Sequence, residues 1–412
     1  MLLLVLGSCT GTTREARRMV RRAERLADTL PDSTLRLIDS VLRMEVYFSE
    51  RERMELAMLQ GEVLFGHHDT AANSIPPLMD DEYFDDKPFF STSPELEHAA
   101  AYFARKKQYG RAATAALYSG FVQQHYGENK IAMQSFKDAE QFGDMAGDSL
   151  AVAMAQYWMG KMLLDDGLRE DALVMLKNAD KGFGNHLAEK ALTQNITGVC
   201  YMLQGEYDNA EIFLKQSLIH SEKSHIDRIK RRALNNYAVL YRSQRKFDLS
   251  IDYLRQIAGA TYLNDGERFT LCLNMGKTFM AAGETDSASV YFQHLEDFLP
   301  EVNVKNESKL SAYGALSLFA KRIGKDSLAL LYREKHEQLL YDVMQKRQEQ
   351  SIYRIQKQYD YENLQNILNR KLLFRQRIIM IISILLLVSP KDSIRFEDLL
   401  PSLKHGWLQA SS

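Results

Sequence analysis

The chain has 412 residues, of which 45% are apolar and 26% are charged, and this mix is that of a folded protein and not of a disordered tail. Its 52 basic and 54 acidic residues leave a formal charge of −2, which argues against a dedicated nucleic-acid-binding protein, because such a protein carries an excess of basic residues. Only 8 prolines and 22 glycines interrupt the sequence, and this favours stacked helices over a β-sandwich with its frequent turns. We therefore expect an all-α chain.

Residues 1–9 resemble the signal segment of a bacterial lipoprotein. An apolar run is followed by two small residues and then by Cys9. The resemblance to a lipobox implies that the segment is cut before Cys9 and that its thiol is lipidated, because export needs a short apolar stretch and the peptidase needs small side chains. The alternative is that Cys9 is incidental. The other cysteines, Cys200 and Cys272, lie in apolar stretches and are expected to be buried free thiols.

Residues 14–100 are expected to hold N-terminal helices and degenerate repeats. The first of these, residues 14–30, keeps apolar residues at helical spacing and carries six arginines on its other face. Two interpretations of this face are open. It is either solvated, or it is attracted to anionic lipid headgroups beside an anchored Cys9, where each basic residue contributes about 1 kcal/mol.

Between residues 101 and 340 one pattern recurs at a nearly constant interval. Five copies have a small residue, a second small residue twelve positions later, and a large apolar residue four positions after that, and a weaker sixth copy has only the two small residues, Ser317 and Ala329. The copies begin 40, 38, 40, 38 and 41 residues apart, which indicates a repeat array. Small residues let two antiparallel helices approach closely, and we expect the large residue to plug the next layer. The clearest pairs of small residues are Gly120 and Ala132, Gly160 and Ala172, Gly198 and Ala210, and Gly276 and Ala288.

These positions resemble tetratricopeptide repeats. The best single copy contains Gly198, Tyr201, Gly205, Tyr207 and Ala210. The resemblance covers roughly residues 110–340 and implies a right-handed α-solenoid of helical hairpins that continues into a long C-terminal helix. The period exceeds the family's usual value of about 34 residues, which implies longer helices or loops.

In such an array the first helix of each hairpin lines an inner surface that binds an extended peptide or a helix. Counted from the small residue, the inward positions fall three and six before it and one and four after it. At these positions Leu117, Val199 and Leu273 are equally compatible with packing between helices. Asn side chains can bind a peptide backbone and basic groups can meet carboxylates, so we expect a partner segment with acidic character. The predicted groove residues are Phe121, Gln124, Tyr157, Lys161, Asn195, Arg232, Asn235, Arg242 and Lys277.

No motif in the sequence predicts catalysis. Residues 276–278 (Gly-Lys-Thr) resemble the end of a phosphate-binding loop, but Leu271 stands where that loop needs glycine. Residues 182–184 (Gly-Phe-Gly) lack the third glycine of a dinucleotide-binding fingerprint. Residues 67–69 (His-His-Asp) are adjacent and not one helical turn apart, as two ligands on a helix would be. We therefore predict a protein that is not an enzyme and that has no catalytic residue, cofactor or metal.

Residues 341–377 predict one long charged helix, because no glycine or proline occurs between 325 and 389. This helix is expected to be either a weak coiled coil that joins two copies of the chain or a solvated stalk. The most apolar stretch follows at 378–389, but 12 helical residues span only about 18 Å of a hydrocarbon core that is about 30 Å thick. We expect this stretch to be a shortened membrane span, an interfacial segment or a buried helix. Of these, we favour association with the membrane. Residues 390–412 form a tail.

This order of elements resembles membrane-attached tetratricopeptide proteins of Bacteroides-type bacteria, which implies a place in the cell envelope with the repeat array in the periplasm. We expect a protein-binding scaffold or sensor input module that captures a peptide or protein segment in its concave groove, attached to the membrane through Cys9, Ile378–Val388 or both. The alternative is a truncated membrane-bound signalling receptor or transcriptional regulator without its cytoplasmic output domain. A soluble cytosolic adaptor would require Cys9 and the apolar run both to be incidental.

Overall fold

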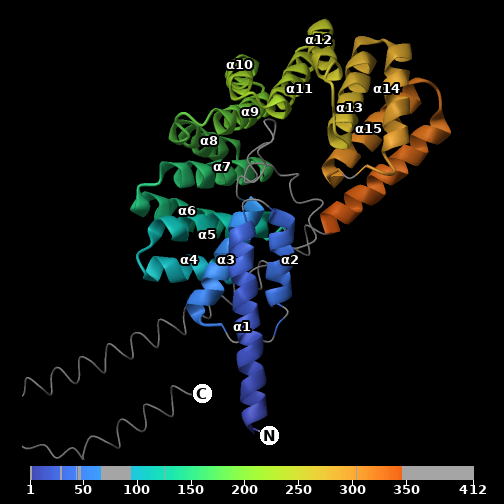
Figure 1. Ribbon diagram of the computed structural model, residues 1–412. Coiled ribbons are helices and arrows are strands. Elements are labelled where there is room, and N and C mark those ends of the chain that lie inside the picture. The colour runs from blue at the N-terminus through green and yellow to red at the C-terminus, as the bar shows by residue number, and fades with distance from the viewer. Residues whose placement is uncertain are drawn as a thin grey trace, which may run out of the picture. The chain divides into compact units, whose positions relative to one another are not determined.

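The computed structural model describes residues 2–345 except 28–29, 43, 45–47, 66–93, 126 and 303. Within these residues the regular secondary structure is α-helical throughout (Figure 1), which confirms the all-α prediction. The predictions for residues 378–389 and 390–412, for nearly all of 341–377 and for the side chain of Cys9 lie outside the described residues. None of the helices described combines the length and the apolar character that crossing a membrane requires.

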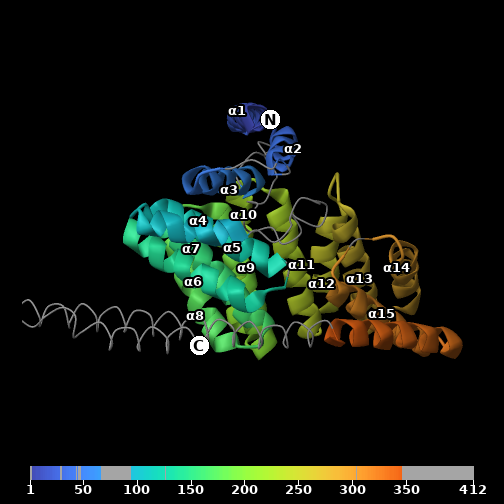
Figure 2. The same ribbon diagram turned by 90° about the horizontal axis from the view of Figure 1, so that it is seen from below.

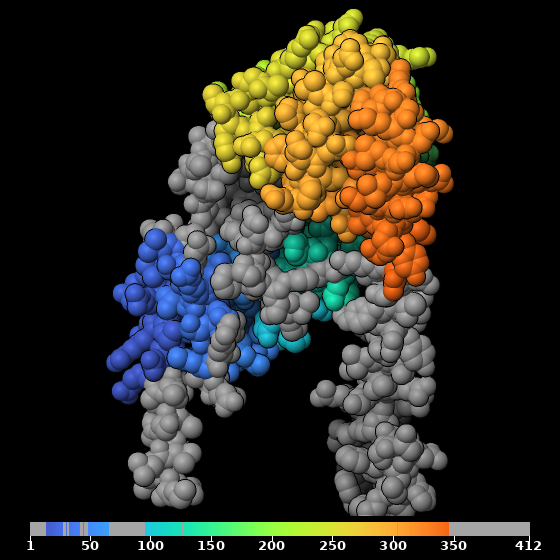
Figure 3. Space-filling model, turned by 90° about the vertical axis from the view of Figure 1, so that its right-hand side faces the viewer, coloured from blue at the N-terminus to red at the C-terminus, as the bar shows by residue number. Residues whose placement is uncertain are grey.

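The helices stack as antiparallel hairpins. In chain order they are α1 (Leu2–Leu26), α2 (Pro31–Leu42), α3 (Glu50–Phe65), α4 (Pro94–Arg105), α5 (Tyr109–His125), α6 (Asn129–Ala146), α7 (Ser149–Asp165), α8 (Arg169–Gly182), α9 (Leu187–Gln204), α10 (Tyr207–Ser224), α11 (Asp227–Ser243), α12 (Phe247–Ala258), α13 (Asp265–Ala282), α14 (Thr285–Phe298) and α15 (Asn306–Arg322), and residues 326–345 are also helical. From α4 to α14 each helix packs against the next, and the first helices of neighbouring hairpins also touch, as α9 touches α11 and α11 touches α13. Figure 3 shows the last hairpins as successive layers, from the yellow α11 and α12 to the orange residues 306–345. The prediction of an α-solenoid is confirmed.

The three N-terminal helices extend this stack. Helix α1 packs on α2, α2 on α3 and α3 on α4 (Figure 2). Ala16 and Ala23 on α1 are fully buried, and the hydroxyl of Thr34 on α2 donates a hydrogen bond to the carbonyl of Ala23 at 3.5 Å. The arginines of α1 are all exposed, and one of them, Arg17, pairs with Glu52 of α3 at 2.8 Å. The basic face is therefore compatible with both interpretations given above.

Within the hairpins, the large residue of the repeat pattern lies directly on the first small residue. The second small residues Ala132, Ala172, Ala210 and Ala288 are all fully buried. A Cβ atom built on the first small residue would clash with the large one at 2.7–2.8 Å, closer than real Cβ contacts. The four pairs are Gly120 with Phe136, Gly160 with Leu176, Gly198 with Leu214, and Gly276 with Phe292. The missing side chain of glycine is thus what lets each pair of helices come into contact.

The large residue also reaches the next hairpin in two of these copies, as the sequence pattern predicted. The ring of Phe292 lies 4.8 Å from that of Phe319 on α15, and the ring of Phe136 lies 6.2 Å from that of Trp158 on α7. The prediction was incomplete, because the same side chain first fills the crossing of its own hairpin. Packing within a hairpin and packing between hairpins therefore share one side chain.

A residue in the left-handed conformation ends the first helix of each hairpin, seven positions after the first small residue. In α9 and α13 this residue is Gly205 or Gly283, with φ of 80° and 91°. In α11 it is Arg245, with φ of 62°, although the chain makes the same backbone hydrogen bonds there. A residue with a side chain costs roughly 1–2 kcal/mol in this conformation, so the backbone at Arg245 carries a strain that the equivalent glycine turns do not. The remaining turns of this kind contain Gly127, Gly167 and Gly324.

The two described cysteines differ in burial. Cys200 is fully buried on α9, as predicted, and its thiol donates to the carbonyl of Arg169 at 3.4 Å. Cys272 is only half-buried, so the prediction for it was wrong, because it lies on α13 at the margin of the core formed by α11 to α15. Burial raises the pKa of both thiols.

Replacing Gly198 by alanine should lower the free energy of unfolding by about 1–3 kcal/mol, because the new methyl group overpacks the crossing with Leu214. Gly110→Ala is the matched control, since a Cβ atom at that helical position meets nothing within 4 Å and alanine favours the helix. Urea denaturation followed by circular dichroism measures both changes. Equal stability of the two variants would contradict the role of Gly198 in the crossing.

Candidate functional site

A chain of asparagine side chains joins the first helices of three consecutive hairpins. Asn236 of α11 donates its side-chain NH₂ to the side-chain oxygen of Asn195 on α9. Asn274 of α13 donates in the same way to Asn235 of α11 at 2.7 Å. Asn195 and Asn274 are only 5% and 8% exposed, and buried amides of this kind need partners. These pairs fix the register of α9, α11 and α13, and we call them the asparagine ladder.

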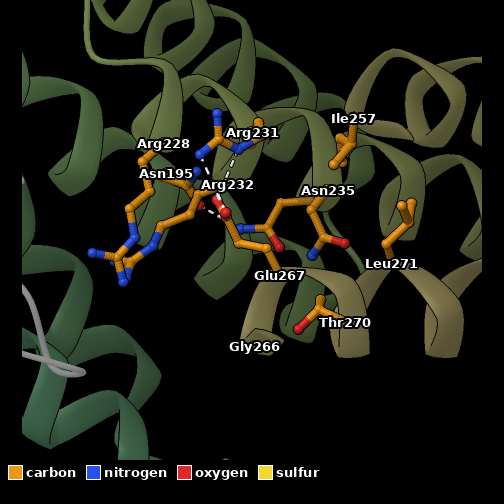
Figure 4. Close-up of a pocket in the computed structure, with 11 residues that line it drawn as sticks. Asn195, Arg228, Arg231, Arg232, Asn235, Ile257, Gly266, Glu267, Thr270 and Leu271 are labelled. Atoms are coloured by element: carbon orange, nitrogen blue, oxygen red, sulfur yellow. Dashed lines mark hydrogen bonds and ion pairs between the residues drawn. The ribbon is translucent and has the colours of Figure 1, made fainter. Parts of the chain in front are cut away.

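A cavity of about 170 Å³ opens beside this ladder between α9, α11 and the start of α13 (Figure 4). Arg231 and Glu267 form an ion pair in its wall, with contacts of 2.8 and 3.2 Å and side chains that are 17% and 16% exposed. Glu267 is held in place because its carboxylate and backbone form a capping box with Asn264 at the start of α13. Figure 4 shows Arg228 and Arg232 extending in the same direction, away from Asn235. The cavity is lined by Asn195, Arg228, Arg231, Arg232, Asn235, Asn236, Ile257, Gly266, Glu267, Thr270 and Leu271.

The wall of this cavity has one hydrogen-bond donor without an acceptor. The side-chain NH₂ of Asn195 is buried and donates to no atom of the described chain, while its oxygen accepts from Asn236. The charged lining residues are three arginines and one glutamate, and that glutamate pairs with Arg231. The chemistry of the cavity therefore suits a ligand that supplies oxygen acceptors.

A second polar cluster contains Arg242 of α11 and Lys277 of α13. One terminal nitrogen of Arg242, Nη1, donates to the side-chain oxygen of Asn274 at 3.1 Å and lies 3.5 Å from the hydroxyl of Thr278. The ammonium of Lys277 donates to the hydroxyl of Ser311 on α15 at 2.6 Å. Burial lowers the pKa of Arg242 to about 10. Burial and then the charge of Arg242 lower the pKa of Lys277 to about 8.

The structure places five of the nine predicted groove residues in these two clusters. Asn195, Arg232 and Asn235 line the cavity, and Arg242 and Lys277 form the second cluster. All five come from α9, α11 and α13, so the inward positions counted from the small residues select one shared face in this part of the array.

Two of the other predicted groove residues lie in the core, and the prediction for them was wrong. Phe121 and Tyr157 are each 2% exposed. The ring of Phe121 lies 5.3 Å from Phe65 and 4.9 Å from Trp158, because α3 covers this end of the array with its last residue. Tyr157 packs edge-on against Trp158 at 5.5 Å.

The remaining two predicted residues, Gln124 and Lys161, are half-exposed on α5 and α7. The ammonium of Lys161 lies 4.5 Å from the centre of the Trp158 ring, a cation–π contact. Neither residue lines the cavity or belongs to the second cluster. The nine residues therefore do not form one continuous groove in the described part of the chain.

Sequence reasoning missed several residues of both clusters. Asn236 and Asn274 each stand two positions before the small residue of their copy, and this recurrence was a usable signal. Arg231 and Glu267 lie 36 positions apart, close to one repeat period, which would place them on neighbouring first helices. Ser311 stands six positions before Ser317, which is an inward position of its copy, but that copy is the weakest of the array and was not used.

Comparisons with known proteins support the fold. No protein-family model matches the chain, and no curated protein matches it by sequence. Among solved structures, the apo form of RapI is 11% identical, covers 69% of this chain and 97% of its own, and superposes with a TM-score of 0.50. The Cut9–Hcn1 hetero-tetramer of the APC/C is 12% identical, covers 75% of this chain and 56% of its own, with a TM-score of 0.47. A Rap protein in complex with competence and sporulation factor is 12% identical, covers 81% and 99%, and has a TM-score of 0.44.

At these identities the similarity shows the fold alone. The chain has a helical-repeat solenoid of the tetratricopeptide type, as the repeat pattern predicted. The stacked hairpins and the packing of neighbouring first helices agree with this assignment.

Replacing Lys277 by methionine should change how stability depends on pH. Since the pKa of Lys277 is about 8 in the folded chain and 10.5 ordinarily, the unfolded chain binds more protons between these values, so wild-type stability rises with pH across that window. Lys277→Met removes this rise and adds on the order of 1 kcal/mol of stability at pH 7, because a buried charge is lost. Urea denaturation from pH 7 to 10.5 measures both effects. The exposed Lys215→Met is the control and should keep the rise; a rise that survives in Lys277→Met would contradict the assignment.

Proposed function

We propose that this chain is a non-enzymatic scaffold that captures a peptide or protein segment on the polar face of α9, α11 and α13. The observation that carries the proposal is the cavity beside the asparagine ladder, which has a buried, unused donor on Asn195 and three arginines in its lining. Solenoids of helical hairpins bind extended segments through the surface that their first helices share. Amides and guanidinium groups recognise the carbonyl and carboxylate oxygens that such a segment carries.

The proposal includes attachment to the cell envelope, with the repeat array in the periplasm. The lipobox-like start ending in Cys9 and the apolar run Ile378–Val388 support this part. The exposed arginines of α1 add to that support, because they follow Cys9 closely in sequence and would lie near the headgroups of an anchored chain. A sensor input module and a passive scaffold are both consistent with this placement.

Reversing the charge of a cavity residue should abolish capture. Arg232→Glu places a carboxylate where we expect the oxygens of the partner segment, so the protein recovered with the tagged chain from crosslinked membranes should fall at least tenfold, as measured by quantitative mass spectrometry. Arg255→Glu, on the exposed side of α12, is the control and should recover the same proteins as the wild type. Unchanged recovery by a folded Arg232→Glu chain would refute capture at this cavity.

Fractionation tests the envelope part separately. The wild-type chain should sediment with membranes, and Cys9→Ala should shift at least part of it to the soluble fraction, since the lipid on the thiol is lost. A mass increase on the N-terminal peptide identifies the lipid directly. A chain that is soluble in both forms would exclude membrane attachment and leave the capture proposal untouched.

A further inference from the structure

The basic side chains on the face shared by α9, α11 and α13 differ in whether they have a carboxylate partner. Arg231 of α11 has a carboxylate partner, Glu267. Arg242 of the same helix and Lys277 of α13 contact only neutral acceptors in the described part of the chain, namely an amide, a backbone carbonyl and two hydroxyls. Both side chains are half-buried, so water does not fully compensate their charges. The second cluster therefore holds two positive charges with no negative one.

Most hydrogen-bond donors of this pair are unused. Arg242 makes its contacts through Nη1, which leaves Nε and Nη2 without an acceptor in the described chain. Lys277 uses one of its three N–H groups. The hydroxyl of Ser311 accepts that bond and keeps its own hydrogen to donate. These donors come from three helices, α11, α13 and α15, and the hydrogen bond between Lys277 and Ser311 joins two of them.

The electrostatics of the cluster favour an anion. Burial, and then the charge of Arg242, lower the pKa of Lys277, and no described carboxylate opposes either charge. Charge-assisted hydrogen bonds to an oxyanion are about twice as strong as neutral ones, and a guanidinium group offers two parallel donors to one such group. An oxyanion between the two side chains would remove their mutual repulsion and satisfy their free donors.

We infer that Arg242 and Lys277, with the hydroxyl of Ser311, form an oxyanion site that takes one carboxylate or phosphate group. The site is distinct from the cavity, because neither cation lines it. The inference rests on the proposed function for one point, namely that the oxyanion is an acidic group of the captured segment. The site itself binds a free anion even when no partner is present. Anion binding and capture can therefore fail independently.

The test uses the purified chain and two probes, inorganic phosphate and acetate, each compared with chloride at the same ionic strength. At about ten times its dissociation constant, the binding probe should raise the melting temperature by about 1–2 °C. Lys277→Met and Arg242→Met should lose this rise, while the exposed-lysine variant Lys215→Met should keep it. A rise with acetate points to a carboxylate, and a rise with phosphate alone points to a phosphate group.

A measurement on the wild type covers the case in which a variant does not fold. Limited acetylation followed by peptide mass spectrometry reports how fast Lys277 reacts, with Lys215 as the internal reference. The bound anion should slow acetylation of Lys277 at least threefold and leave Lys215 unchanged. No protection of Lys277 by either probe, or a melting shift that is equal in all variants, would overturn the inference.

Discussion

The array depends on close contact between two helix backbones at one point in each hairpin. At Gly120, Gly160, Gly198 and Gly276 no side chain separates the helices, and a leucine or phenylalanine of the partner helix fills the space. Because this contact recurs about every 40 residues, it brings the first helices into contact with one another, hairpin after hairpin. The asparagine ladder and both polar clusters exist only because α9, α11 and α13 are held at that separation.

In two copies of the repeat, a hydrogen bond joins the two helices of the hairpin at the crossing where the other copies have glycine and alanine. In the copy that starts at Ala238, the hydroxyl of Ser250 donates to the carbonyl of Ala238 at 2.8 Å, and in the last copy Ser317 donates to the carbonyl of Ala329 at 2.9 Å. A serine hydroxyl that bonds across the crossing replaces the contact made by glycine and alanine elsewhere. The constraint is therefore on the distance between the helices and not on a particular residue.

The fold could be predicted from the sequence, because the small residues and the helix-ending glycines recur at regular intervals and determine the structure near them. It was insufficient for part of the site, because burial of an inward position depends on what covers it. Phe121 was expected in a groove, but Phe65 of α3 packs against it, and the repeat spacing does not predict this contact. Arg242 and Lys277 were predicted as basic groove residues of the first helices, but it takes both helices in place to see that no described carboxylate pairs with either.

The turn at Arg245 has a consequence for how the array comes apart. Each hairpin touches only its neighbours, so opening can start at one place and spread in either direction. The turn between α11 and α12 holds a side chain where the equivalent turns have glycine, and the N–H of Arg245 bonds to the carbonyl of Arg242. Apolar side chains of α11 and α12, on the two sides of this turn, belong to one buried core that continues to α15. Among the turns of this series, amide hydrogen exchange would thus be fastest at this one, and an anion bound by Arg242, Lys277 and Ser311 would tie α11 to α13 and α15 beside it.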